Sequence, residues 1–336
     1  MSEEVRTPGS TEKRIINALT IDVEDYFQVH AFSNAIRPED WESYEPRVRE
    51  NTLLILDMIE LCSEIKAKVD GNNDWKHSAT FFVLGWVAER FPDLVKEIAA
   101  RGHEIASHGY SHKCIYNQTR KEFEEDVRKA KSILENITGK AIQGYRAPTY
   151  SIRKDTLWAI EVLISEGFVY DSSIFPIKHD NYGLAEAPRF PFFIYVDKEK
   201  VNFQKMEQVS LGERRRNSGR RLLEVPLTTT RLLGANMPIA GGGYFRALPY
   251  RLTKTFLKKV NNREKKPFIF YVHPWELDKS APKMSGGNLL SSLRTYLNLK
   301  KTEERLARLL SEFRFSSVSQ LLENIKENGS YDRFGS

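Results

Sequence analysis

The sequence is poor in cysteine and in long apolar runs. Cys62 and Cys114 are the only cysteines among 336 residues, which excludes a disulfide framework and a zinc ribbon. No apolar run reaches the length of a membrane-spanning helix. The polar N-terminus, residues 1–14, lacks the apolar centre of a signal peptide, and we expect it to be flexible. These absences predict a cytoplasmic protein without a transmembrane segment.

Charge is abundant but mixed in sign. Lys and Arg together number 51 and Asp and Glu 45, so the formal net charge is +6, and 40% of the residues are hydrophobic. A chain of this length and composition can bury a sizeable core. The small basic excess is typical of an ordinary protein surface, so we expect no nucleic-acid partner. It would allow peripheral association with a membrane surface.

Strand-like and helix-like patterns alternate along the first half of the chain. Short apolar runs predict strands at residues 17–25, 78–85, 103–108, 141–148 and 168–174, with a later one at 267–276. Amphipathic patterns predict helices at residues 49–68, 91–102, 119–139 and 155–167. Repeated strand–helix units predict an α/β fold with a parallel sheet, which can be open or closed into a barrel.

The pattern weakens between about residues 180 and 265. Residues 188–196 and 221–233 read as strands, and the arginine-rich stretch 211–221 between them reads as a solvated loop. Three consecutive glycines, residues 241–243, lack the following lysine of a phosphate-binding loop and instead indicate a tight turn near the active site. Residues 291–325 predict one or two amphipathic helices that pack on the core.

Chemically competent side chains follow one predicted strand after another. In parallel α/β folds, functional groups gather at the carboxyl ends of the strands. The residues in question are Asp22, Glu24, Asp25, His108, His112, Arg146, Asp171 and His273. Their repeated placement favours a single site.

The pair His108 and His112 is the strongest sign of a metal. The same spacing on a helix would suit a zinc metalloprotease, but Gly109 stands where that class needs glutamate. A catalytic zinc site needs a third protein ligand, and "DVED" offers three carboxylates. Strand alternation puts Asp22 and Glu24 on one side, so one could bind the metal while the other accepts a proton from water.

Four stretches, taken in order, carry a family resemblance. "LTIDVED", "SHGYSH", "YRAPTYS" and "FYVHPWE" resemble the successive motifs of the polysaccharide deacetylases, the carbohydrate esterases with the NodB homology domain. The resemblance covers roughly residues 15–277. It implies a distorted (β/α) barrel of about seven strands and a hydrolase that removes the acetyl group from N-acetylated sugars.

The resemblance also implies a metal site. It gives Glu24, His108 and His112 as ligands, although Asp25 is an alternative to Glu24, because Val23 separates Asp22 from the next acid where the family more often has two adjacent aspartates. This spacing resembles the allantoinase-like and peptidoglycan deacetylase-like branch of the family. Two imidazoles and a carboxylate suit Zn²⁺ best, while cobalt, nickel and iron also accept such ligands.

The remaining roles are implied in the same way. Asp22 would be the base, Arg146 would orient it, and His273 would donate a proton to the departing amine. A backbone N–H near Thr149 would stabilise the oxyanion. The candidate substrate-binding residues are Thr149, Tyr150, Asp171 and Trp275. The motif around Asp171 lacks the usual tryptophan, which puts its stacking role in doubt.

Two later stretches, "VPLTTTRLLGANMPIAGGGYFRALPYRL" and "RTYLNLKKTEERLARLLSEFRF", resemble a narrower subgroup found in exosortase-associated exopolysaccharide clusters. In that subgroup a domain of unknown function continues to the C-terminus. We therefore expect a flexible terminus at residues 1–14, a catalytic domain at 15–277 and a helical extension at 278–336 that packs on the barrel. The expected substrate is an N-acetylated polysaccharide or a lipid-linked oligosaccharide precursor. An allantoinase-like cyclic amide hydrolase and an inactive carbohydrate-binding scaffold are the alternatives.

Overall fold

Seven parallel strands form the centre of the molecule. The computed structural model describes residues 15–71, 75–179, 182–197, 200–206, 221–284 and 295–325. The parallel strands are β1 (Ile16–Val23), β2 (Thr80–Val83), β3 (Glu104–Ser107), β4 (Gly144–Tyr145), β5 (Tyr170–Asp171), β8 (Arg221–Glu224) and β11 (Ile269–Val272). They pair in the spatial order β11-β1-β2-β3-β4-β5-β8, and every adjacent pair is parallel. The predicted α/β barrel of about seven strands is confirmed.

The barrel has a seam between β8 and β11. Within the described residues, no strand ladder joins these two strands. The backbone N–H of Ile269 instead donates to Thr228 Oγ1 at 2.7 Å, and a single parallel bridge links Gly241 to Tyr271. The chain after β8 therefore fills the seam with an irregular path, which explains why a regular strand–helix pattern was absent from this part of the sequence.

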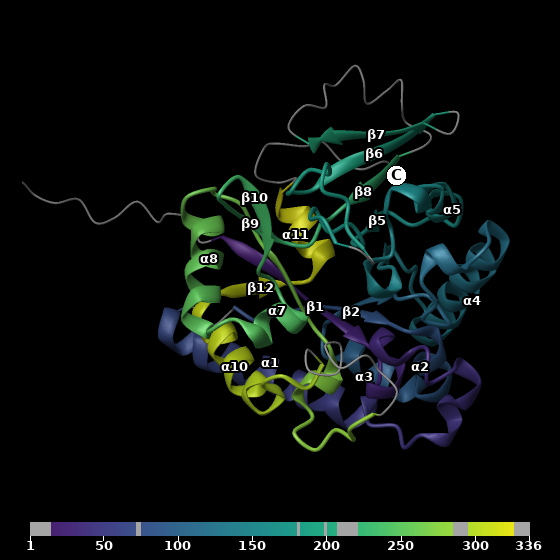
Figure 1. Cartoon of the computed structure of the whole chain (residues 1–336). Helices are drawn as coiled ribbons and strands as arrows, with labels where there is room; N and C mark the ends of the chain where they lie inside the picture. The colour runs from purple at the N-terminus through teal and green to yellow at the C-terminus, as the bar shows by residue number, and fades with distance from the viewer. Residues whose placement is uncertain are drawn as a thin grey trace, which may run out of the picture.

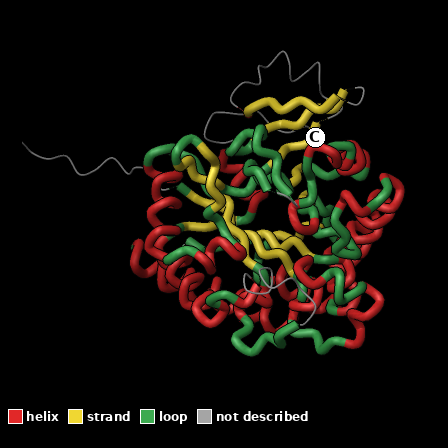
Figure 2. Tube along the Cα trace, in the orientation of Figure 1, coloured by secondary structure: helices red, strands yellow, loops and turns green. Residues whose placement is uncertain are grey.

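Helices surround the strands on the outside (Figures 1 and 2). They are α1 (Val48–Asp70), α2 (Gly85–Arg90), α3 (Pro92–Ala100), α4 (Arg120–Thr138), α5 (Ala159–Ser165), α7 (Gly242–Ala247), α8 (Tyr250–Asn262) and α10 (Thr302–Glu312). The predicted helices at 49–68, 91–102 and 119–139 are confirmed, whereas the one at 155–167 is shorter. Within the described part of the chain, no helix has the length and apolar character needed to cross a bilayer.

The C-terminal extension closes the barrel at the amino ends of its strands. Strand β12 (Arg314–Ser316) pairs with the start of β1, and helix α11 (Val318–Ile325) follows it. Leu321 and Leu322 of α11 pack against apolar side chains that line the barrel interior, among them Phe82 and Leu223. The predicted packing of this extension on the barrel is confirmed, while β12 was not predicted. The apolar plug leaves the opposite, carboxyl end of the strands for polar chemistry.

Two β-hairpins are added to the barrel. Strands β6 (Phe192–Asp197) and β7 (Lys200–Lys205) are antiparallel, and β6 continues the sheet beyond β8. Strands β9 (Thr229–Leu232) and β10 (Ala235–Pro238) form a separate two-stranded sheet.

The sequence predicted β6 and a strand over 221–233, but not β7, β10 or α8. The predicted terminal flexibility at 1–14 and most of the predicted loop at 211–221 lie outside the described residues, and the domain boundary at 277 stays a prediction.

One buried acid pair crosses the barrel wall. Asp171 on β5 and Glu224 on β8 are register partners, and both side chains are fully buried. Burial raises the pKa of both carboxyls, and their mutual interaction adds to this for Glu224, although the nearby Arg146 opposes the effect. The folded state therefore retains a proton here at a pH where an unfolded chain would have lost it.

This pair should make stability depend on pH. Because the folded pKa values are raised, the stabilising contribution of the bound proton is complete below the ordinary carboxyl pKa of about 4. It is lost as pH rises through the raised values, of which that of Asp171 is a pKa of about 6. Glu224→Gln should therefore gain stability relative to the wild type between pH 5 and pH 8. Urea unfolding at both pH values measures this. Glu264→Gln, at a half-buried ion pair with Arg189, is the control, and an equal response of both variants would contradict the assignment.

Candidate active site

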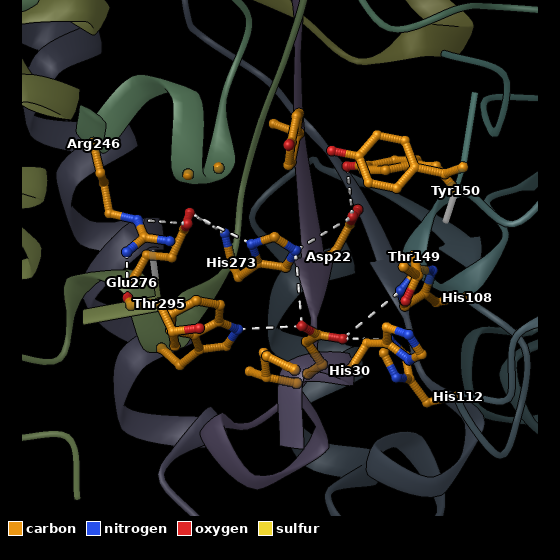
Figure 3. Close-up of a pocket in the computed structure, with 18 of the residues that line it drawn as sticks. Asp22, His30, His108, His112, Thr149, Tyr150, Arg246, His273, Glu276 and Thr295 are labelled. Atoms are coloured by element: carbon orange, nitrogen blue, oxygen red, sulfur yellow. Dashed lines mark hydrogen bonds and ion pairs between the residues drawn. The ribbon is translucent and has the colours of Figure 1, made fainter. Parts of the chain in front are cut away.

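A cavity of about 260 Å³ lies at the carboxyl end of the strands. Side chains from β1, from the segments after β3 and β4, and from the segment after β11 line it, as Figure 3 shows. The sequence-predicted residues that line it are Asp22, Glu24, His108, His112, Thr149, Tyr150, His273 and Trp275. The strands thus bring together residues as far apart as 22 and 275 in the sequence.

Glu24, His108 and His112 form a compact group. One ligand atom from each lies within 4.8 Å of the others, and this is the only such triad that the described residues contain. Glu24 Oε2 lies 2.5 Å from His112 Nε2 and 4.0 Å from His108 Nε2. Apart from these imidazoles, the buried Oε2 atom has no hydrogen-bond partner among the described residues. An otherwise unsatisfied carboxylate oxygen facing two imidazole nitrogens fits a divalent metal ion.

The ring of His108 is held in the tautomer that a ligand needs. Its Nδ1 lies 2.9 Å from the carbonyl oxygen of Arg146, so Nδ1–H donates and Nε2 keeps its lone pair towards Glu24. Burial lowers the pKa of His108 to about 4, which keeps the imidazole neutral. Burial alone would raise the pKa of Glu24, but the neighbouring His112, His273 and His108 outweigh it and lower that pKa to about 2.

The segment between the two histidines turns sharply. Gly109 has φ +71°, and a Cβ there would lie 2.8 Å from Asp126 Oδ2. Asp126, on α4, accepts hydrogen bonds from the backbone N–H of Tyr110 at 2.7 Å and of Ser111 at 3.0 Å. Gly109 therefore allows a tight turn, which Asp126 of α4 holds in place. This turn brings His112 to the same side as His108.

Asp25 does not join the triad of Glu24, His108 and His112. Its carboxylate accepts hydrogen bonds from the backbone N–H groups of Tyr26, Arg47 and Val48, at 2.8, 2.6 and 2.9 Å. It thus caps the first turn of α1, whose unpaired N–H groups favour an acidic partner. Of the two acids that the sequence left open as ligand, the structure brings only Glu24 to the histidines.

Asp22 and Arg146 form a buried ion pair beside the triad. Arg146 Nη1 donates to Asp22 Oδ1 at 2.6 Å, and the arginine side chain is completely buried. The same guanidinium donates to Thr20 Oγ1 at 2.9 Å and to Ser172 at 3.0 Å. Tyr150 Oη donates to the other oxygen of Asp22 at 3.3 Å. These contacts orient the Asp22 carboxylate.

The turn after Arg146 is conformationally unusual. Pro148 begins a short 3₁₀ turn in which Thr149 and Tyr150 have φ values of +57° and +54°. Two consecutive non-glycine residues in the left-handed region are costly and are typical of functional sites. The turn directs the Tyr150 ring towards Asp22 and brings Thr149 to the cavity.

His273 occupies the centre of the site. Its Nε2 lies 3.8 Å from Asp22 Oδ2 and 3.7 Å from Glu24 Oε1, and its ring stacks on Trp275. Burial alone would lower the pKa of His273, but Glu276, Glu24 and Asp22 together raise it to about 9. A protonated imidazole next to a carboxylate can serve as a proton donor. Trp275 Nε1 in turn donates to Glu24 Oε1 at 3.2 Å.

Asp171 does not reach the cavity. It is fully buried, its carboxylate accepts from Ser173 Oγ, and it pairs with Glu224 in the barrel wall. The predicted substrate contact through this residue is therefore unsupported by its position. Sequence reasoning also missed seven polar side chains that line the cavity: His30, His179, Tyr182, Arg246, Tyr271, Glu276 and Thr295. Of these, Tyr271 and Glu276 lie within the recognised motif "FYVHPWE".

Comparisons with known proteins agree with this arrangement. Residues 73–163 match the family described as "Polysaccharide deacetylase", and residues 172–323 match "Domain of unknown function (DUF3473)". A peptidoglycan deacetylase from Helicobacter pylori is 38% identical over 96 residues, which are 29% of this chain and 32% of that protein. The chain thus spans about a third of that relative's length.

Solved structures share the fold. A probable polysaccharide deacetylase from Pseudomonas aeruginosa PAO1 aligns with a TM-score of 0.53 at 13% identity, over 94% of this chain and 92% of that one. The allantoinase Puue aligns with a TM-score of 0.51 at 13% identity, over 94% and 91%. At such identities the likeness concerns the barrel and not the activity. The two family matches show that this chain combines a polysaccharide deacetylase domain with a DUF3473 domain in its C-terminal half.

Proposed function

We propose that the protein is a metal-dependent N-deacetylase that hydrolyses the acetamide of N-acetylated sugars in a polysaccharide or its lipid-linked precursor. The observation that carries this proposal is the convergence of the Glu24, His108 and His112 triad, the Asp22–Arg146 ion pair and His273 on one cavity. The similarity to a peptidoglycan deacetylase supports an N-acetyl sugar as substrate class. The match to the C-terminal domain supports a role in exopolysaccharide biosynthesis, as the subgroup resemblance implies.

Glu24, His108 and His112 would hold the ion. Zn²⁺ suits two neutral imidazoles and one ionised carboxylate, and three protein ligands leave a position open. When bound, such an ion polarises the acetamide carbonyl and makes water a stronger acid. Trp275 Nε1 and the Arg146 carbonyl hold the Glu24 and His108 side chains in position.

Asp22 acts as the base. It removes a proton from the water that attacks the acetyl carbon, while Arg146 and Tyr150 hold the carboxylate in place. The backbone near Thr149 provides an N–H for the developing oxyanion. Both the proton acceptor and the oxyanion donor thus come from segments anchored by the barrel strands.

His273 acts as the acid. Its Nε2 donates a proton to the sugar nitrogen as the carbon–nitrogen bond breaks, so the amine leaves neutral and acetic acid remains, which ionises to acetate in water. The 16% exposure of this side chain keeps it accessible from the cavity. Water adds to the acyl carbon, one bond to nitrogen breaks, and the two proton transfers balance.

Metal removal should abolish activity. We expect the protein to release acetate from N-acetylated oligosaccharides, to lose this activity after treatment with a chelator, and to regain it with added Zn²⁺. Acetate is measured enzymatically across a panel of oligosaccharides, alongside metal analysis of the purified protein. Turnover of a cyclic amide by metal-free protein would instead support the allantoinase-like alternative. Sugar binding without acetate release would support an inactive scaffold.

Ligand and base variants should separate metal binding from turnover. His112→Ala should lose bound metal and activity together, because it removes one of three ligands. Asp22→Asn should retain the metal but lower kcat by about 10²- to 10⁴-fold, as expected for loss of a general base. His103→Gln, at a histidine outside the cavity, is the control. Full activity in Asp22→Asn would disprove the assigned base.

A further inference from the structure

Residues of the domain of unknown function reach the centre of the site. Arg246, His273 and Glu276 all lie within the matched range 172–323. Figure 3 shows Arg246 and Glu276 on one side of His273, with His108 and His112 on the other. We propose that Arg246 and Glu276 are positioning residues that hold the imidazole of His273 for proton donation, and that this is a function of the DUF3473 part of the chain. The inference rests on the proposed function.

Glu276 is placed to orient the His273 ring. Its side chain is buried, and its Oε2 lies 3.4 Å from His273 Nδ1. The same oxygen accepts the backbone N–H of His273 at 3.1 Å. Nδ1 is buried and has no other partner among the described residues. A carboxylate at Nδ1 keeps a proton on that nitrogen and directs Nε2 to the reacting groups.

Arg246 holds Glu276 from the other side. The arginine is 3% exposed, and its Nε donates to Glu276 Oε1 at 3.0 Å. Its Nη1 donates to the backbone carbonyls of Thr295 and, at 3.4 Å, of Leu297. The guanidinium also lies over the Trp275 ring, 5.3 Å from its centroid. Each oxygen of Glu276 therefore has a partner of its own, one towards His273 and one towards Arg246.

The C-terminal extension fixes Arg246 in turn. Asn298 Nδ2 donates to the Arg246 carbonyl at 2.9 Å. Arg305, on α10, donates to the same carbonyl at 3.0 Å and to those of Phe245 and Leu248 at 2.8 and 3.2 Å. These bonds satisfy carbonyl oxygens at the end of α7. A chain of direct contacts thus runs from α10 through Arg246 and Glu276 to the proton donor.

An ion pair that only stabilises the fold would not need a carboxylate that also contacts His273, as Glu276 does. Burying an arginine and a glutamate costs desolvation free energy, and an apolar pair of similar volume is often equally stable. Here the carboxylate is in addition shared with the imidazole that faces Asp22 and Glu24. The arrangement predicts that loss of Glu276 impairs proton donation specifically.

Two substrates can separate proton donation from the other steps. Cleavage of an N-acetylated chitooligosaccharide needs a protonated leaving group, whereas 4-nitrophenyl acetate releases a phenolate that leaves without protonation. In the metal-loaded protein, Glu276→Gln should lower kcat for the amide by about 10- to 100-fold. KM for the amide, the metal content and chelator-sensitive hydrolysis of the ester should stay within about twofold of the wild type. Arg246→Gln should show a smaller loss with the same preference for the ester.

The controls keep the test decisive. Glu264→Gln removes the acid of another Arg–Glu pair outside the cavity and should change neither substrate's turnover. Parallel loss of amide and ester hydrolysis in Glu276→Gln, or loss of its metal, would overturn the inference in favour of a structural role.

A second measurement separates this inference from the proposed function. If the wild type released no acetate from any amide, the proposed deacetylase activity would fail. Nitrogen-15 spectra of histidine-labelled, metal-loaded protein would still test the positioning. The signal of the proton on His273 Nδ1 is identified by its absence in His273→Gln. It should be observed in the wild type and lost in Glu276→Ala, because the proton then exchanges with water. Its persistence in Glu276→Ala would refute the role of Glu276.

Discussion

The buried guanidinium of Arg146 is the interaction on which the site depends. It is the largest fully buried side chain of the described residues, and it joins β1 to the segment after β5 through Thr20, Asp22 and Ser172. Its backbone carbonyl also accepts the Nδ1–H of His108. One residue therefore orients both the candidate base and a candidate metal ligand. A buried charge with this many partners cannot be replaced without leaving several polar groups unsatisfied.

The barrel divides into an apolar half and a polar half. At the end closed by α11, side chains such as Phe82, Leu223 and Leu321 form an apolar cluster. At the opposite end, carboxylates, imidazoles and the Arg146 guanidinium replace them. Charges can be kept in this second half because almost every one has an opposite charge or a hydrogen-bond partner. The apolar plug gives the stability that such a charged interior would not provide by itself.

The C-terminal part of the chain contributes to both ends of the barrel. Its strand β12 and helix α11 close the end at the amino ends of the strands, while Arg246, His273 and Glu276 complete the cavity at the carboxyl ends. Gly241 and Gly242 make this possible, because a Cβ at either would lie within 2.5 Å of Tyr271 atoms. The chain can therefore pass close to β11 and begin α7 at the edge of the cavity. The extension belongs to the same structural unit as the barrel.

Much of this arrangement was accessible from the sequence. Apolar periodicity determined the early strands and the long helices, because those elements bury one face along their whole length. Motif order determined the family, the barrel and the residues that meet at the strand ends. Residues such as Asp22, His108, Arg146 and His273 directly follow strands or end them, so the parallel topology alone predicts that they converge.

Other features depended on the tertiary structure. The sequence left Glu24 and Asp25 as alternatives, and only the tertiary structure shows that Glu24 lies beside the two histidines while backbone N–H groups at the start of α1 bind Asp25. Arg246 and Glu276 carry no local pattern, and their pairing arises because α7 and the segment after β11 meet across the cavity. Local sequence thus determined the elements and the chemical groups at their ends. The partners of those groups were decided by contacts between distant segments, which no periodicity or spacing encodes.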